Sequence, residues 1–240
     1  MFFFEIFIII FLIFFQSIFG IGLLLFGTPT FLLLGYNFLE VLNLLLPMSV
    51  TISLIQFFSS KKKNKQFIHD FNLYCLPFLI IALYAVIKNI NKIDLEIYIA
   101  LIIIFFSIVS LKKKKILYLK NLNSAKQKIF LSALGIIHGL TNLGGSLLAV
   151  LSSAINKQDK NKIRYCISYG YLIMGIFQIS VLHFFSNSHI KAVNLLYLIL
   201  VLIIYFPSQK IFINFQSKKF LKFLNMTALF YGVVILIKNI

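Results

Sequence analysis

The chain has 240 residues, of which 60% are hydrophobic and only 12% are charged, and its mean hydropathy is +0.97. A soluble domain carries about 25% charged residues, so this composition excludes an ordinary soluble protein and indicates an integral membrane protein. The formal net charge of +17 does not indicate a nucleic-acid-binding protein, because the lysines come in short bursts between apolar segments, as at 61–65 and 112–115. Such bursts are typical of loops that face anionic lipid headgroups.

Apolar segments of membrane-spanning length follow one another along the whole chain. A spanning helix needs about 20 apolar residues, and the segments near this length are 2–26, 38–58, 71–90, 94–111, 129–152, 163–186, 190–206 and 221–238. They predict an all-α integral membrane protein with about eight transmembrane helices, because spanning strands would be shorter and would alternate in polarity. No basic stretch precedes the first segment and no small-residue cleavage site follows it, so we expect a spanning helix there rather than a removable signal peptide.

A long basic connection at 112–128 divides the chain into two halves, which we expect to be related four-helix repeats at 1–111 and 129–240. Each half opens with a glycine cluster, and no glycine lies between the two clusters; their members are Gly20, Gly22, Gly27 and Gly35, and Gly135, Gly139, Gly144 and Gly145. A shift of 122 residues places Gln16 over His138 and Gly20 over Asn142. With an even number of spans in each half, the repeats would run parallel unless one segment is re-entrant.

The glycine clusters predict breaks in helices 1 and 5. Glycine tolerates unusual backbone angles and lets backbones approach closely. Within a membrane, non-helical backbone occurs only where it is buried in protein or lines a wet cavity, and half-helix N-termini there can bind anions. The alternative is close helix packing through small residues, which Gly135 and Gly139 fit better than the adjacent pair Gly144 and Gly145.

The stretches GIGLLLFGTPTFLLLGYN (20–37) and HGLTNLGGSLLAV (138–150) resemble the sulfite exporter TauE/SafE family of membrane permeases. That family has two related halves, each opening with a glycine-rich turn. The matching residues are Gly20, Gly22 and Pro29 in the first half and Gly144, Gly145 and Ser146 in the second. Leu23, Leu24 and Leu151 stand where the family often has glycine or proline. The resemblance implies a multi-pass permease of the cytoplasmic (inner) membrane, commonly for sulfite or small organosulfonate anions.

Polar side chains inside the apolar segments are further candidates for a substrate site. His138 lies mid-span, where an ionisable group suggests function and proton coupling; a neutral histidine bonded between helices is the alternative. Arg164 is the only arginine and could bind an oxyanion through two hydrogen bonds, or it could reach for headgroups. Gln178 is a pore-lining or packing amide, and Thr141 and Asn142 complete the polar lining of the second break.

We therefore expect a transporter for a small anion that works in the lipid bilayer, with proton or ion coupling, and without nucleic acid, metal or cofactor. Cys75 and Cys166 have no neighbouring Cys or His at ligand spacing. An intramembrane enzyme is disfavoured because the chain contains no HExxH or GxSxG motif. A non-transporting membrane scaffold or subunit of a larger complex stays as the alternative. The sequence leaves the oligomeric state, and the choice between carrier and channel, open.

Overall fold

The computed structural model describes residues 2–60, 63–89, 124–156, 159–186, 190 and 192–214, and within these ranges the regular structure is entirely helical. The helices are α1 (Phe2–Phe19), α2 (Leu23–Leu33), α3 (Phe38–Ser59), α4 (Lys65–Tyr74), α5 (Leu76–Asn89), α8 (Ser124–Thr141), α9 (Gly145–Ile155), α10 (Lys160–Phe185) and α11 (Ala192–Asn214). Among the described residues, four stretches are long and apolar enough to cross a membrane: Phe38–Ser59, Lys65–Asn89, Lys160–Phe185 and Asn194–Ile213. The all-helical prediction is confirmed for this part of the chain, while the expected spans at 94–111 and 221–238 lie outside the described residues.

Local capping fixes where α3 and α10 begin. The Asn37 side chain accepts a hydrogen bond of 3.0 Å from the backbone N–H of Glu40, and the Glu40 carboxylate accepts one of 3.1 Å from the N–H of Asn37. This reciprocal pair is a capping box, which satisfies two of the free N–H groups at a helix start. Asp159 plays the corresponding part for α10, where its carboxylate accepts from Asn161 and Lys162.

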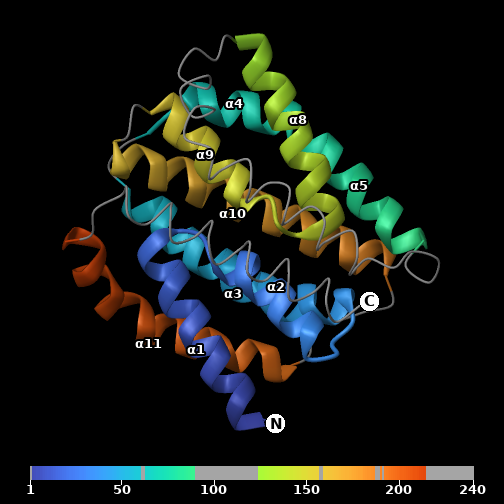
Figure 1. Ribbon diagram of the computed structural model, residues 1–240, viewed down its shortest axis with the longest axis vertical. Helices are drawn as coiled ribbons and strands as arrows, with labels where there is room; N and C mark the ends of the chain where they lie inside the picture. Colours follow the sequence, from blue (N-terminus) through green and yellow to red (C-terminus); the bar gives the residue numbers. More distant parts are fainter. Residues whose placement is uncertain are drawn as a thin grey trace.

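Helices α3 and α10 pack against each other at the centre of the molecule and run antiparallel (Figure 1). Near the end of α3, the Phe57 ring stacks on Tyr165 near the start of α10, with ring centroids 5.3 Å apart. Farther along, Val50 of α3 contacts Gly175 of α10. The two helices begin at residues 38 and 160, which differ by the 122-residue shift. The two segments that this shift superimposes therefore run antiparallel, which is the arrangement expected only if one segment of a half is re-entrant.

The outer helices are exchanged between the two halves of the chain. Helix α11 packs against α1, and α5 packs against α8, at opposite ends of the molecule (Figure 1). The α5–α8 contact is so close that a Cβ on Gly139 would lie 2.6 Å from the Leu79 carbonyl oxygen, and one on Gly135 would collide with the Cys75 carbonyl. These two glycines therefore allow close helix packing. Such packing was the alternative to a helix break at this cluster.

A carboxylate joins the start of α1 to two other segments. Glu5 accepts hydrogen bonds from the Tyr36 hydroxyl at 2.8 Å, in the turn after α2, and from the Tyr197 hydroxyl at 3.1 Å, in α11. Burial and the nearby Glu5 carboxylate raise the pKa of Tyr36 to about 12. The Tyr36 bond therefore holds α1 against the turn after α2, and the Tyr197 bond holds α1 against α11.

Candidate functional site

The first glycine cluster separates α1 from α2 and reverses the direction of the chain. Gly20 and Gly22 have φ angles of +77° and +138°, a backbone region that residues with a Cβ rarely adopt. After this turn α2 lies back against α1, because the rings of Phe15 and Phe26 meet with centroids 5.1 Å apart. In a continuous helix these two residues would be about 16 Å apart along the axis. The α1–α2 segment is thus a helical hairpin rather than one straight span.

Gln16 occupies the inside of this first turn. Its side-chain oxygen accepts a hydrogen bond of 3.2 Å from the backbone N–H of Leu23, the first residue of α2. Its side-chain nitrogen donates to the hydroxyls of Ser49 and Ser53 of α3, at 3.0 and 3.4 Å. The positive end of α2 is therefore bound by an uncharged side chain of the protein itself.

The C-terminal end of α1 is held by side chains from three other helices. The Ser17 carbonyl accepts from the Gln56 amide at 3.1 Å, the Arg164 guanidinium at 3.3 Å and the Gln209 amide at 3.1 Å. Arg164 also donates to Gln209 at 2.6 Å and to the Tyr205 hydroxyl at 3.3 Å. A cation near a helix C-terminus complements the helix dipole. Arg164 thus lies next to the first turn, where its guanidinium is bonded to α1 and α11.

The second glycine cluster separates α8 from α9 in a similar way. Asn142 follows the last residue of α8 with a φ angle of +62°, and asparagine is the residue besides glycine that best tolerates this region. The backbone N–H of Gly144 donates to Nδ1 of His138 at 3.0 Å. Because Nδ1 accepts this bond, the ring proton is on Nε2, and the imidazole is neutral in this arrangement.

A directed chain of hydrogen bonds continues from His138 to the other half of the protein. Nε2 of His138 donates to the Gln178 side-chain oxygen at 3.1 Å, and the Gln178 nitrogen donates to the Asn142 oxygen at 3.3 Å. The Asn142 nitrogen then donates to the Thr28 hydroxyl of α2 at 3.0 Å. All four side chains are completely buried. The second turn is therefore bonded directly to α2, which follows the first turn.

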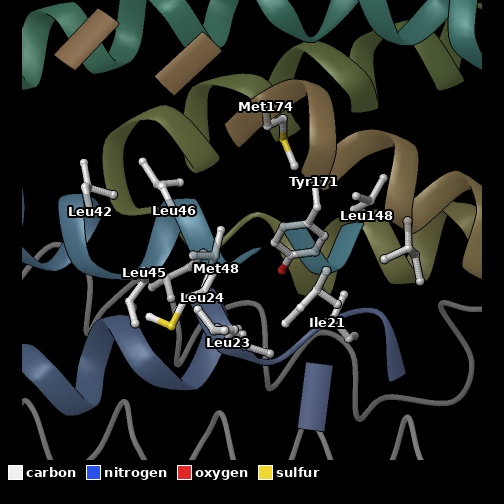
Figure 2. Packing of buried hydrophobic residues seen from close by; sticks show 14 of the residues in the cluster. Ile21, Leu23, Leu24, Leu42, Leu45, Leu46, Met48, Leu148, Tyr171 and Met174 are labelled. Carbon is white, nitrogen blue, oxygen red and sulfur yellow. The ribbon is translucent and has the colours of Figure 1, made fainter. Parts of the chain in front are cut away.

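Apolar side chains fill the space beside the two turns. Figure 2 shows Tyr171 of α10 with its hydroxyl directed toward Leu24 and Met48, close to Ile21 of the first turn. The Tyr171 side chain is fully buried, and its hydroxyl has no hydrogen-bond partner among the described residues. A Cβ on Gly145 would collide with this hydroxyl, so the glycine is what lets Tyr171 lie against the start of α9.

The structure brings most of the sequence-predicted site residues together in two groups. His138, Asn142, Gly144 and Gln178 form one hydrogen-bonded group, and Gly20 lies beside Arg164, whose Cγ would be 3.9 Å from a Cβ at that glycine. The others lie close by without joining either group. Gly22 immediately precedes α2 and Gly145 begins α9. Thr141 bonds to its own helix at Ile137, Pro29 is buried within α2, and Ser146 is partly exposed in α9.

Sequence reasoning missed several side chains that complete these groups. They are Gln16, Ser17, Thr28 and Gln56, all completely or almost completely buried, while the buried Tyr171 lies beside the groups without a hydrogen bond to a described residue. A signal was present for some of them, because Ser49, Ser53 and Gln56 recur at helical spacing within an otherwise apolar span and so share one face of α3. For Thr28 and Tyr171 no pattern in the sequence indicates which segment they face.

Apolar helices of spanning length with buried polar groups at helix interruptions define a multi-pass membrane protein. The family model described as "Sulfite exporter TauE/SafE" matches residues 5–236, which is nearly the whole chain. The chain therefore belongs to the sulfite exporter TauE/SafE family and is a membrane transporter, as its sequence motifs suggested. Comparisons with curated proteins and with solved structures gave no match.

Proposed function

We propose that the protein is a permease that moves a small anion, such as sulfite or an organosulfonate, across the cytoplasmic membrane, with a site between the two helix turns. The observation that carries this proposal is the pair of interrupted helices. Both α2 and α9 begin inside the protein, so that each aims a helix N-terminus, with its partial positive charge, at a buried region. In transporters such half-helix N-termini attract anionic substrates.

The proposal includes two related four-helix halves, at 1–111 and 129–240, joined by 112–128. The helix bounds support it, because α1 and α8, and likewise α2 and α9, differ by 122 residues at both ends. The antiparallel α3–α10 pair favours repeats that are inverted with respect to the membrane. Inverted repeats are a common basis of alternating access, in which one unit rocks against the other around a central site.

Charge neutralisation in such a site would come from backbone N–H groups and from Arg164. His138 is the group best suited to proton coupling, because a proton added to Nδ1 would displace the N–H of Gly144 and so disturb the second turn. The bond from Asn142 to Thr28 would carry that disturbance to α2. Binding of a proton and binding of an anion would then shift the conformational equilibrium of the same pair of turns.

The test is anion flux in proteoliposomes that hold the full chain, with sulfite, sulfonates, sulfate and short carboxylates, each with and without a pH gradient. Gly22→Leu and Gly144→Leu should abolish the flux, because each side chain would collide with a neighbour, Phe15 or His138 respectively. Ala133→Leu, at an exposed position of α8, is the matched control and should transport normally. If both glycine variants transport as wild type does, the site assignment is wrong.

The alternative of a non-transporting scaffold or subunit is tested with the same preparation. A scaffold would co-purify with a partner at fixed stoichiometry, and the isolated protein would give no flux with any of these anions.

A further inference from the structure

Four buried side-chain polar atoms have no hydrogen-bond partner among the described residues, and two of them lie at the first turn. These two are the Ser17 hydroxyl and the side-chain oxygen of Gln56. Ser17 is completely buried and Gln56 is 2% exposed. An unpaired buried polar atom is costly, so two such atoms in residues at or near this turn are candidate contacts for a bound group.

The orientation of the Gln56 amide is fixed by its neighbours. Its nitrogen donates to the backbone carbonyls of Gln16 and Ser17, each at 3.1 Å. A flipped amide would place its oxygen against these two carbonyl oxygens, so the unpaired atom is an acceptor. This oxygen would lie 3.5 Å from a Cβ on Gly20, so it faces the turn itself.

A cationic side chain with unused hydrogen-bond donors, Arg164, lies at the same turn. The Ser17 carbonyl has two lone pairs but is approached by three side-chain donors, and the Arg164 bond, at 3.3 Å, is the longest of the three. All hydrogen bonds of Arg164 to described residues use a single nitrogen, Nη2. No acidic side chain of the described residues forms an ion pair with it. The guanidinium can therefore turn other N–H groups to an anion.

The second turn has fewer unpaired polar groups that could bind an anion. His138, Gln178 and Asn142 use their polar atoms on one another, on Gly144 and on Thr28. Among the described residues there, the Tyr171 hydroxyl is the one buried side-chain group without a partner, and none of the cationic side chains belongs to the hydrogen-bonded group. The two turns are thus chemically unequal, although both begin a half-helix.

We propose that, within the site between the two turns, the anion is held by side chains at the first turn, with Arg164 and the Ser17 hydroxyl as donors and the Gln56 oxygen as an acceptor, and that the second turn supplies no side-chain contact to it. This inference rests on the proposed function and deepens it. One acceptor among the donors suits an oxyanion that still carries a proton, such as hydrogensulfite, better than a fully ionised one such as sulfate. The site would then select its substrate by protonation state as well as by charge.

The test is direct binding of sulfite to the purified full-length protein by calorimetry, at mildly acidic pH where sulfite is mostly hydrogensulfite. Arg164→Gln should weaken binding by about tenfold or more, because a charge-assisted bond is lost. Lys162→Gln removes the same charge from an exposed position two residues away and should change the affinity less than about twofold. Sulfate should bind wild-type protein at least about tenfold more weakly than hydrogensulfite.

Serine variants separate binding from folding. Ser17→Ala removes an unpaired hydroxyl, so the unfolding temperature without sulfite should stay the same or rise, while sulfite affinity falls several-fold. Ser152→Ala and Tyr171→Phe remove the other two buried, unpaired hydroxyls and should leave sulfite binding unchanged.

Three results would overturn the inference. Ser17→Ala and Arg164→Gln could bind like wild type while Tyr171→Phe does not, which would move the site to the second turn and leave the permease function standing. Sulfate could bind as tightly as hydrogensulfite, which would remove the role given to Gln56. Wild-type protein could bind no sulfite at all, which would overturn the inference. Flux of another anion would then still support the permease function, whereas absence of all flux would contradict both the inference and the permease function.

Discussion

At the scale of single residues, Gln16 and His138 perform the same task with different chemistry. Each is 122 residues from the other, and each accepts a hydrogen bond from the backbone N–H at or just before the start of the following helix, Leu23 or Gly144. An amide does this without ever changing charge, whereas an imidazole does it only while Nδ1 is unprotonated. Protonation therefore cannot break this contact at the first turn. At the second turn, protonation of Nδ1 would break it.

His138→Phe should destabilise the protein, because it leaves the Gly144 N–H and the Gln178 oxygen unpaired in a buried place. We expect a loss of about 1–3 kcal/mol for each unpaired group. Adding Gln178→Leu should cost less than the sum of the two single changes, by about 0.5–3 kcal/mol, because the variants share one hydrogen bond. Unfolding of all three variants in detergent measures this coupling. Ile136→Phe, exposed on the same helix, is the control, and strict additivity would contradict the chain of bonds.

At the scale of helices, the two kinds of glycine have different structural roles. Gly20 and Gly22 permit a turn, while Gly135 and Gly139 let α8 approach the backbone of α5. Sequence alone left both roles open for each cluster, since a glycine in an apolar segment can serve either. Neighbouring helices decide between them, and the sequence does not state which helix lies alongside.

Gly139→Leu should force α8 and α5 apart, because the new side chain would meet the Leu79 carbonyl oxygen and the Ala82 side chain. Overpacking of this kind costs about 1–3 kcal/mol or more. The unfolding temperature in detergent should fall clearly, while Ala133→Leu, on the exposed face of α8, should leave it nearly unchanged. Equal effects of the two variants would argue against the close α5–α8 contact.

The Glu5 contact predicts an alkaline limit to stability. The pKa of Tyr36 is raised to about 12, by burial first and by Glu5 second, from an ordinary value of 10.0. Between these values the unfolded chain loses the proton while the folded protein keeps it, so stability should fall as the pH rises from about 10 to about 12. Tyr36→Phe should flatten this part of a pH–stability curve. Tyr84→Phe, on α5 and away from Glu5, should not.

At the scale of the whole molecule, the antiparallel pair α3 and α10 lies at the centre, and most other described helices pack against it. The sequence predicted the helical class and most of the described spans well, because hydropathy is a local signal. It left the relative direction of the two halves conditional, because parallel halves were expected only if the first segment crosses the membrane once. The α1–α2 hairpin removes that premise, and a turn of this kind follows from backbone angles that hydropathy does not record.

An engineered disulfide tests this antiparallel packing. The Cβ of Val50 lies 3.9 Å from the position of a Cβ on Gly175, within the range of about 3.5–4.5 Å that disulfides require. In a background with Cys75→Ala and Cys166→Ala, the pair Val50→Cys and Gly175→Cys should cross-link on mild oxidation in membranes. The pair Val50→Cys and Ile176→Cys, with the second cysteine on an exposed face, should not. Failure of the first pair to cross-link would contradict the arrangement of α3 and α10.

The exchange of outer helices limits how such a chain could have arisen. Because α11 lies on α1 and α5 lies on α8, neither half carries all the neighbours of its own first helix. If the halves descend from one shorter ancestor, that ancestor would have needed a second copy of itself to cover its first helix. The second copy would have had the opposite orientation in the same membrane. Gene fusion would then have made permanent a partnership between two oppositely oriented subunits, and only afterwards could Gln16 and His138 have diverged.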